Sequence, residues 1–330
     1  MSKGVTVYTA ADAPPGGLTD ETVAVIGYGN LGRTVALNLR DSGVKVRIGN
    51  REDEYAERAR ADEFDVVSVG EAAAADVILV LLPDEVIPAV FVGEIAPALR
   101  SGSAVAFASG YSLAFGLIQP PTDVDVLLLA PRSPGSVART RYLAGEGFWA
   151  CIGVESDRSG RAQPRLLALA DAIGALRAGA IQMSARQEAT LDLFVEQTVG
   201  ALVGMALMVA FEVGCEAGVP PEAMIMEMYG SGEMESVFRS FRETGFFRAS
   251  EEHGPTALYG GIIRTLGMDR EAIATNFRAI LEDITSGGFA ARFQEEAKSG
   301  YPMLSVAKAM VQEASPISIA EDRLRRLQGR

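Results

Sequence analysis

Histidine and cysteine, which often serve catalysis and metal binding, are scarce in this sequence of 330 residues: there is one histidine, His253, and there are two cysteines, Cys151 and Cys215. Both cysteines lie in apolar contexts typical of buried thiols, and they imply neither a disulfide framework nor a zinc site. Basic charge is also in deficit, with 30 Lys and Arg against 43 Asp and Glu. A net charge of −13 without a long basic run argues against a nucleic-acid partner.

Signals for export and for membrane insertion are missing as well. The N-terminal stretch MSKGVTVYTAADAPPGG has no basic region followed by an apolar core. The longest near-apolar run, Val199 to Cys215, is short for a membrane span and carries Glu212, so we expect a buried helix there. We therefore predict a cytoplasmic protein that binds no membrane.

Short β-branched runs alternate with amphipathic stretches from Val23 to about Gly179. The runs are VAVIG, VKVRIG, DVVSV, DVILVLLP, SAVAFAS, DVDVLLLAP and FWACIGV. Strands this apolar belong to a parallel sheet that is covered on both faces. We predict an α/β fold whose residues 1–183 form a Rossmann-type, doubly wound dinucleotide-binding domain.

Strand-like runs disappear beyond Met183, and helical periodicity takes over. We predict helices and assign residues 184–330 to an all-α domain; the expected helices are Ala185–Gly218, Pro221–Thr244, Arg270–Ser286, Ala290–Ser299 and Ser318–Leu327.

A G-x-G-x-x-G motif follows the first apolar strand and opens a helix. Its residues are Gly27, Tyr28, Gly29, Asn30, Leu31 and Gly32. The first glycine permits a tight turn, the second lets the backbone approach a pyrophosphate, and the third lets helix pack on strand. The pyrophosphate would then lie at the helix N-terminus. The chain is therefore expected to bind NADH or NADPH.

Cofactor choice depends on the residues that end the second strand. This segment contains Asn50, Arg51 and Asp53, about 20 residues after the glycines. Arg51 would stack on adenine or meet the 2′-phosphate of NADPH, whereas Asp53 and its acidic neighbours would repel that phosphate. We favour NADH.

The order of motifs resembles the ketol-acid reductoisomerase family over nearly the whole chain. The resemblance rests on VIGYG and ALNLRDSG (25–43), LLPDEV (81–86), IAP (95–97), AFA (106–108), DVDV (123–126), AP (130–131), DLFxEQ (192–197) and EAG (216–218). It implies a Rossmann domain followed by a knotted helical domain that dimerises, with active sites formed across the dimer. We also expect Leu82 and Pro83 to border the cofactor.

The resemblance implies magnesium ligands on two helices, one of them from the partner subunit. The first pair matches Asp192 and Glu196, whose spacing places both carboxylates on one helix face. In the second pair, Glu227 occupies one position and Ser231 stands where a glutamate is expected. This set would hold at most one firm Mg²⁺.

Other family positions differ in this chain. Ser109 stands where the family has its active-site histidine, and Arg132 replaces a lysine. Ser109 would then either donate a hydrogen bond or only fill the space of the histidine, and Arg132 would anchor an anionic group of the substrate. His253 lies in the expected substrate region and is either a surface histidine or the source of a proton near neutral pH. Tyr111 and Tyr259 are further candidate substrate contacts.

These differences affect the alkyl migration that the family couples to hydride transfer, because migration needs divalent ions to stabilise alkoxide charge. Our leading hypothesis is a reductase of a small 2-oxo or hydroxy-oxo compound in specialised metabolism, with isomerisation lost or weak. The alternatives are an imine reductase, a genuine ketol-acid reductoisomerase of branched-chain amino-acid synthesis, and a dinucleotide sensor without catalysis.

Overall fold

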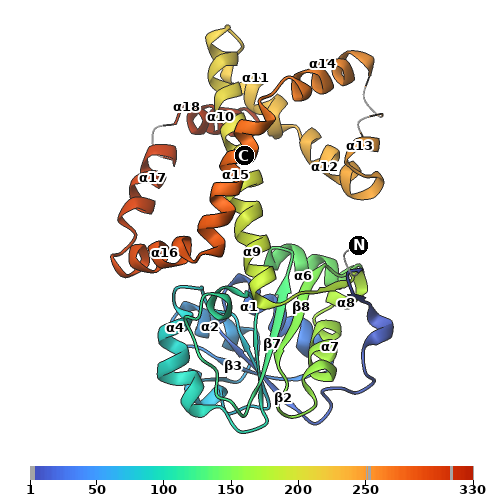
Figure 1. The fold of residues 1–330 in the computed structure, drawn as a ribbon, viewed down its shortest axis with the longest axis vertical. Coiled ribbons are helices and arrows are strands. Elements are labelled where there is room, and N and C mark those ends of the chain that lie inside the picture. Colours follow the sequence, from blue (N-terminus) through green and yellow to red (C-terminus); the bar gives the residue numbers. More distant parts are fainter. Residues whose placement is uncertain (1–3, 250, 252–253, 313–314, 330) are drawn as a thin grey trace. The chain divides into compact units, whose positions relative to one another are not determined.

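The computed structural model describes residues 4–249, 251, 254–312 and 315–329, which form two compact units, Met1–Asp192 and Leu193–Arg330. The first unit contains the sheet, and the second is helical (Figure 1). This α/β and all-α composition confirms the predicted fold class.

The sheet of the N-terminal unit has nine strands in the order β1-β9-β8-β7-β6-β5-β2-β3-β4. They are β1 (Val7–Tyr8), β2 (Thr22–Ile26), β3 (Lys45–Gly49), β4 (Val66–Val67), β5 (Val77–Val80), β6 (Ala104–Phe107), β7 (Asp125–Pro131), β8 (Ala150–Ser156) and β9 (Ala180–Gln182). Seven of these coincide with the apolar runs of the sequence, whereas the two- and three-residue strands β1 and β9 were not predicted.

The six neighbouring strands β7, β6, β5, β2, β3 and β4 pair in parallel in that order. Strand β8 runs antiparallel to β7. We predicted a sheet that is parallel throughout. The antiparallel pairs β7–β8 and β1–β9 correct that prediction. Pro131 at the end of β7 pairs with Ala150 at the start of β8. The connection between them therefore leaves and re-enters the sheet at the same edge, where the chain has to turn back.

Helices cover both faces of this sheet. They are α1 (Asn30–Asp41), α2 (Glu54–Ala61), α3 (Val69–Ala72), α4 (Ile87–Val90), α5 (Tyr111–Ala114), α6 (Gly135–Leu143), α7 (Ala162–Ala172), α8 (Ala175–Ala178) and α9 (Ala185–Val195), the last crossing the unit boundary. Val23 and Val25 pack with α1 and α7, while Ala24 and Ile26 pack with α3 and α4 on the other face. Alternate residues of one strand are thus buried in separate cores, as the continuous apolar strands predict.

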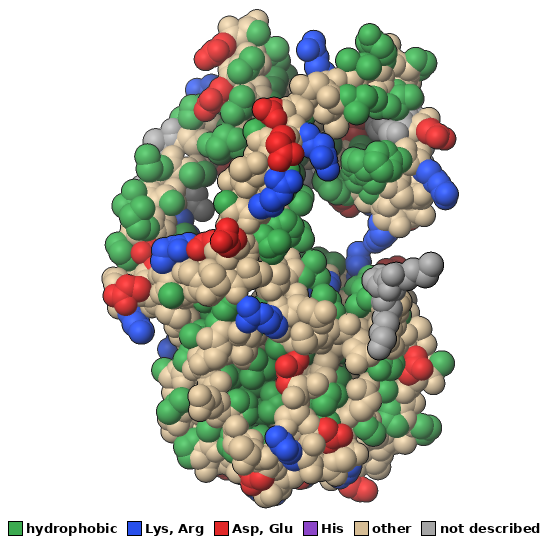
Figure 2. Space-filling model, in the orientation of Figure 1, with side chains coloured by type: hydrophobic (Ala, Val, Ile, Leu, Met, Phe, Trp, Pro, Cys, Tyr) green, Lys and Arg blue, Asp and Glu red, His purple; other side chains and the backbone are tan. Residues whose placement is uncertain are grey.

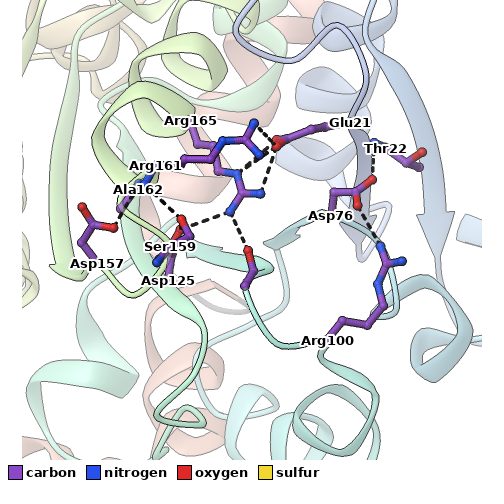
Figure 3. Close-up of polar contacts among 11 residues, drawn as sticks. Glu21, Thr22, Asp76, Arg100, Asp125, Asp157, Ser159, Arg161, Ala162 and Arg165 are labelled. Atoms are coloured by element: carbon purple, nitrogen blue, oxygen red, sulfur yellow. Dashed lines mark hydrogen bonds and ion pairs between the residues drawn. The ribbon is translucent and has the colours of Figure 1, made fainter.

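A buried ionic network closes the amino-terminal edge of the sheet (Figure 3). Arg165 donates to Glu21 through Nε at 3.0 Å and to Asp125 through Nη1 at 3.1 Å. Burial alone would raise the pKa of Asp125, yet hydrogen bonds from Ser159 hold it below its usual range. The network anchors α7 to the edge opposite the glycine turn.

The C-terminal unit contains α10 (Ala201–Glu216), α11 (Pro221–Ile225), α12 (Glu233–Thr244), α13 (Phe246–Ala249), α14 (Pro255–Leu266), α15 (Arg270–Thr285), α16 (Gly288–Lys298), α17 (Pro302–Gln312) and α18 (Pro316–Leu327). Helices α13, α14 and α17 were not predicted. The helix expected from Pro221 to Thr244 is interrupted at Gly232, whose positive φ of 82° ends one helix and starts the next.

Helix α10 corrects the expectation of a buried helix, because Phe211 is its only buried side chain in the described part of the chain. Its apolar residues are exposed, Met205 and Val213 by 57% each. Figure 2 shows apolar side chains spread over the surface of the helical unit. The sequence pattern identified an apolar helix correctly but not its exposure.

Candidate active site

The glycine turn lies between β2 and α1, with each glycine in a different environment. Gly27 has a φ of +93°, and a Cβ there would lie 2.7 Å from the carbonyl oxygen of Leu81. A Cβ on Gly32 would collide with the carbonyl oxygen of Gly27. At Gly29, a Cβ would point into space that no described atom fills within 4 Å. Gly27 thus forms the tight turn, Gly32 permits close packing, and Gly29 leaves the backbone open to a ligand. A pyrophosphate site requires these three roles.

The neighbours of the turn also fit a dinucleotide. Asn30 and Leu31 start α1, whose first amide groups point toward the open side of the turn. Leu82 approaches the turn so closely that a Cβ added to Gly27 would lie 2.9 Å from its Cδ2, and Pro83 follows it. Tyr28 contributes its backbone, since its side chain is 1% exposed and donates to Asp62 at 2.8 Å.

The carboxyl end of β3 carries the residues expected to select the cofactor. Asn50 accepts from the amide of Tyr28 at 3.2 Å and donates to Asp53 at 2.9 Å. Asp53 caps α2, and its partner Arg51 is 85% exposed. Hydrogen bonding to Arg51 holds the pKa of Asp53 below its ordinary value, so this carboxylate is charged where a ribose would bind.

A second polar cluster lies at the carboxyl ends of β5, β6 and β7, beside α9. Its members are Asp84, Ser109, Arg132, Glu188 and Asp192, all within the N-terminal unit. The amide of Gly110 donates to Glu188 at 2.6 Å, which connects the β6 loop to α9. In open α/β sheets ligands bind at this end of the strands, so the cluster lies where a substrate is expected.

Arg132 is the cation of this cluster and bridges two carboxylates of α9. One terminal nitrogen pairs with Glu188 and the other with Asp192, one helical turn further on. Glu188 is 1% exposed in its side chain, and burial raises its pKa despite the neighbouring guanidinium. Arg132 therefore offsets one of the two negative charges that α9 presents to the site.

Asp84 and Ser109 form the other half of the cluster. The Ser109 hydroxyl donates to Oδ2 of Asp84 at 3.5 Å and accepts from the amide of Tyr111 at 3.2 Å. Burial raises the pKa of Asp84 to about 6, with further contributions from Glu188, Glu85 and Asp192. This carboxyl therefore exchanges its proton close to neutral pH.

The remaining candidates lie outside this cluster. Tyr111 is 3% exposed and packs edge-on against Phe115. Glu196 opens a π-helical turn (Glu196–Gly200), Glu227 lies in a second one (Met226–Gly230), and Tyr259 is 72% exposed on α14. His253 lies outside the described residues.

Glu188 and Asp84 belong to the cluster but were not predicted. Glu188 precedes Asp192 by four residues, so the same helix-face argument that paired Asp192 with Glu196 would have found it. Asp84 follows β5 in the LLPDEV segment, and only the contact with the β6 loop distinguishes it from an ordinary loop aspartate.

Comparison with known proteins identifies the family. Residues 17–179 match the acetohydroxy acid isomeroreductase NADPH-binding domain, and residues 186–329 match the ketol-acid reductoisomerase C-terminal domain. The chain belongs to the ketol-acid reductoisomerase family. It is therefore an NAD(P)H-dependent oxidoreductase of the ketol-acid reductoisomerase type, as the sequence resemblance predicted.

Individual family members are similar along the whole chain. The ketol-acid reductoisomerase (NADP(+)) of Pyrobaculum neutrophilum is 39% identical over 326 residues, covering 97% of this chain and 98% of that protein. The structure of an NADH-preferring ketol-acid reductoisomerase from an uncultured archean superimposes with a TM-score of 0.91 at 33% identity, covering 98% of this chain and 99% of that one. A semialdehyde dehydrogenase NAD-binding protein from Cupriavidus necator, at 23% identity and a TM-score of 0.56 over 79% of this chain and 99% of that one, shares the fold alone.

Proposed function

We propose that this protein is a ketol-acid reductoisomerase: it rearranges a 2-hydroxy-3-oxo acid such as acetolactate and reduces the rearranged acid to a 2,3-dihydroxy acid with NAD(P)H. The observation that carries the proposal is the extent of the similarity, 39% identity over 97% of the chain to an enzyme of that name. A shared cofactor fold alone would not extend through the helical domain. This favours the isomeroreductase over the reductase of specialised metabolism that we set first from the sequence.

The glycine turn and the polar cluster supply what hydride transfer needs. The turn binds the pyrophosphate, and the nicotinamide would extend toward the carboxyl ends of β5 and β6. Arg132 offsets one of the two charges of Glu188 and Asp192, which reduces the repulsion between α9 and an anionic substrate. Hydride addition then requires only a polarised carbonyl and a proton source.

Magnesium is the group that the family implies for the migration step. The donor chemistry fits, because carboxylate oxygens are the ligands that Mg²⁺ prefers, and Asp192, Glu196 and Glu227 of the partner subunit would hold it. When bound, the ion would stabilise the alkoxide charge of the migration. Among the described residues, one chain brings together no three Asp, Glu, His or Cys groups suited to a metal. We propose that a second chain completes the site.

Two substitutions favour a second candidate function, reduction without migration. Ser109 replaces the histidine and Ser231 one of the four carboxylates that the resemblance implies. Migration depends on those groups more than hydride transfer does. Such an enzyme would reduce a rearranged 3-hydroxy-2-oxo acid, or an imine, but not acetolactate.

We further propose NADH as the preferred cofactor and a homodimer as the active form. The acidic pair Glu52 and Asp53 at the end of β3 would repel a 2′-phosphate, and Arg60 and Arg51 are already paired with them. The helix from Ala185 to Glu216 is long and apolar enough to span a membrane, yet only 11% of its apolar window is buried. In a family of soluble biosynthetic enzymes, we assign this surface to a second copy of the chain.

One experiment separates these functions. NADH and NADPH oxidation would be followed with acetolactate, with the already rearranged 3-hydroxy-3-methyl-2-oxobutanoate and with cyclic imines, each with and without Mg²⁺. An isomeroreductase turns over both acids and needs Mg²⁺ for acetolactate; turnover of the rearranged acid alone supports the second candidate. A Gly29→Glu variant, which fills the open side of the glycine turn with a negative charge, is the cofactor-blocked control. Cofactor binding without any turnover would contradict both and leave a sensor.

A further inference from the structure

We propose that Ser109 and Asp84 form the proton-delivery pair of the reduction: the Ser109 hydroxyl protonates the carbonyl oxygen as the carbonyl carbon receives hydride, and Asp84 replaces the serine proton. The inference rests on the proposed function, because it completes the hydride-transfer step of that reaction. Ser109 would be the catalytic residue and Asp84 the residue that positions and recharges it.

The pair lies at the end of the sheet where the reaction is expected. Ser109 and Asp84 follow β6 and β5, two neighbouring parallel strands whose carboxyl ends share one edge of the sheet. The segment leading to Asp84 also borders the glycine turn, since Leu81 and Leu82 approach Gly27. Both side chains are therefore positioned near the expected nicotinamide, close to the reacting carbonyl.

Hydrogen bonds hold Ser109 in an orientation suited to proton transfer. The amide of Tyr111 donates to the serine oxygen at 3.2 Å, and the hydroxyl donates to Asp84 at 3.5 Å. When Asp84 is protonated, its carboxylic acid donates to the serine oxygen instead, and the hydroxyl hydrogen is free to bind the carbonyl oxygen. Tyr111 starts α5 and is buried, so its amide holds the serine in place. Ser109 itself is half-buried, which leaves it accessible to a ligand.

The charges facing Asp84 favour its protonated form. Glu85 on its own segment and Glu188 and Asp192 on α9 all act in this direction, in addition to burial. The Ser109 hydrogen bond acts in the opposite direction, and Arg132 is paired with Glu188 and Asp192. Asp84 is thus a carboxyl that holds a proton near neutral pH beside a hydroxyl that can pass it on.

Atoms and electrons balance in this step. Hydride from the dihydronicotinamide forms a C–H bond at the carbonyl carbon, and the electron pair of the C=O π bond moves to oxygen. That oxygen takes the proton of the Ser109 hydroxyl, which in turn takes the proton of the Asp84 carboxylic acid. The products are the alcohol, the oxidised cofactor and an Asp84 carboxylate, which water reprotonates.

The test measures reduction of 3-hydroxy-3-methyl-2-oxobutanoate by NADH from pH 5 to pH 9, which isolates hydride transfer from migration. Wild-type kcat/KM should fall as pH rises above the pKa of Asp84. Asp84→Asn and Ser109→Ala should each lower kcat about 100-fold at pH 6 and flatten this pH profile, while NADH affinity is retained. The double variant should be no slower than the slower single variant, because the two groups act as one unit. Asp84→Glu should restore part of the rate.

Asp123→Asn is the matched control, since Asp123 is an exposed aspartate on the loop before β7 at the opposite edge of the sheet. It should leave both rate and pH profile within about twofold. A steep pH profile that persists in Asp84→Asn, or additive losses in the double variant, would overturn the proposal. A purely structural role of Asp84 would lower cofactor affinity and rate at every pH alike.

A readout without turnover separates failure of this inference from failure of the proposed function. Carbon-13 NMR of aspartate-labelled protein, with Asp84→Asn for assignment, gives the pKa of Asp84 directly, and Ser109→Ala should raise it. A carboxyl that titrates below pH 5 with and without NADH would overturn the proton-delivery pair even in an active enzyme. Failure of acetolactate turnover alone would contradict the isomeroreductase and leave the pair standing.

Discussion

Arg51 donates from Nε to Oδ2 of Asp53 at 2.7 Å, so the two residues expected to decide cofactor choice are bound to each other. The same carboxyl caps α2 through the amides of Tyr55 and Ala56. In this arrangement the exposed guanidinium is held by an acid rather than being available to a 2′-phosphate. The proposed preference for NADH would therefore depend in part on the charge of Asp53, which an asparagine of the same shape removes.

Asp53→Asn tests this relationship. Asparagine keeps the oxygen that caps α2, but its amide no longer binds Arg51 as an ion pair. The ratio of kcat/KM for NADPH to that for NADH should rise about fivefold, as expected for an exposed ion pair. Adding Arg51→Gln should cancel the gain. A gain that survives without Arg51 would show that some other cation meets the phosphate.

Asp84 should make stability depend on pH. Its pKa is about 6 in the folded protein against an ordinary 3.8, so the folded state binds the proton more tightly than the unfolded state. As the pH rises from about 4 to about 6, the free energy of unfolding should therefore fall by about 3 kcal/mol in total.

The variant Asp84→Asn removes this dependence. It should match the wild type below pH 4 and exceed it by up to about 3 kcal/mol at pH 8. Urea unfolding of the cofactor-free proteins at both pH values measures the difference. If the variant and the wild type differ in free energy of unfolding by the same amount at both pH values, the substitution acts through packing. A variant that is more stable at pH 8 but turns over more slowly would show that Asp84 lowers the stability of the fold and is needed for the reaction.

The sequence predicted those features that are local in the chain. The glycine turn, seven strands and the charged end of β3 each depend on residues close together, so their pattern was sufficient. Asp84 was missed because its role comes from a contact with Ser109, 25 positions away. The spacing of Glu188 from Asp192 was visible in the sequence, but its contact with Gly110, 78 positions away, was not. Arg132 was expected to bind the substrate, and only the fold shows it between two carboxylates. The exposure of α10 was also unpredictable, because apolar periodicity does not distinguish a core from an interface.

The ionic network at the amino edge of the sheet should stabilise the fold without affecting catalysis. Arg165 is 6% exposed and binds Glu21 and Asp125, which are themselves buried. Arg165→Met should lower the free energy of unfolding by about 3 to 5 kcal/mol, because it leaves buried carboxylates uncompensated. Arg161 also binds Glu21 but is 58% exposed, so Arg161→Met should cost about 0 to 1 kcal/mol. Chemical denaturation compares the two variants, and equal losses would argue against burial as the cause.

The apolar surface of α10 should be a subunit interface. Met205 is 57% exposed there, and Met205→Glu would place a carboxylate in a surface that dimerisation removes from water. Light scattering after gel filtration should show a dimer for the wild type and a smaller species for the variant. Leu143→Glu, at a residue 66% exposed on α6 of the other unit, is the matched control and should stay dimeric. Because Glu227 of the partner subunit is proposed to complete the magnesium site, Met205→Glu should also lose acetolactate turnover more than reduction of the rearranged acid. A monomeric wild type with full activity on both acids would contradict the shared site.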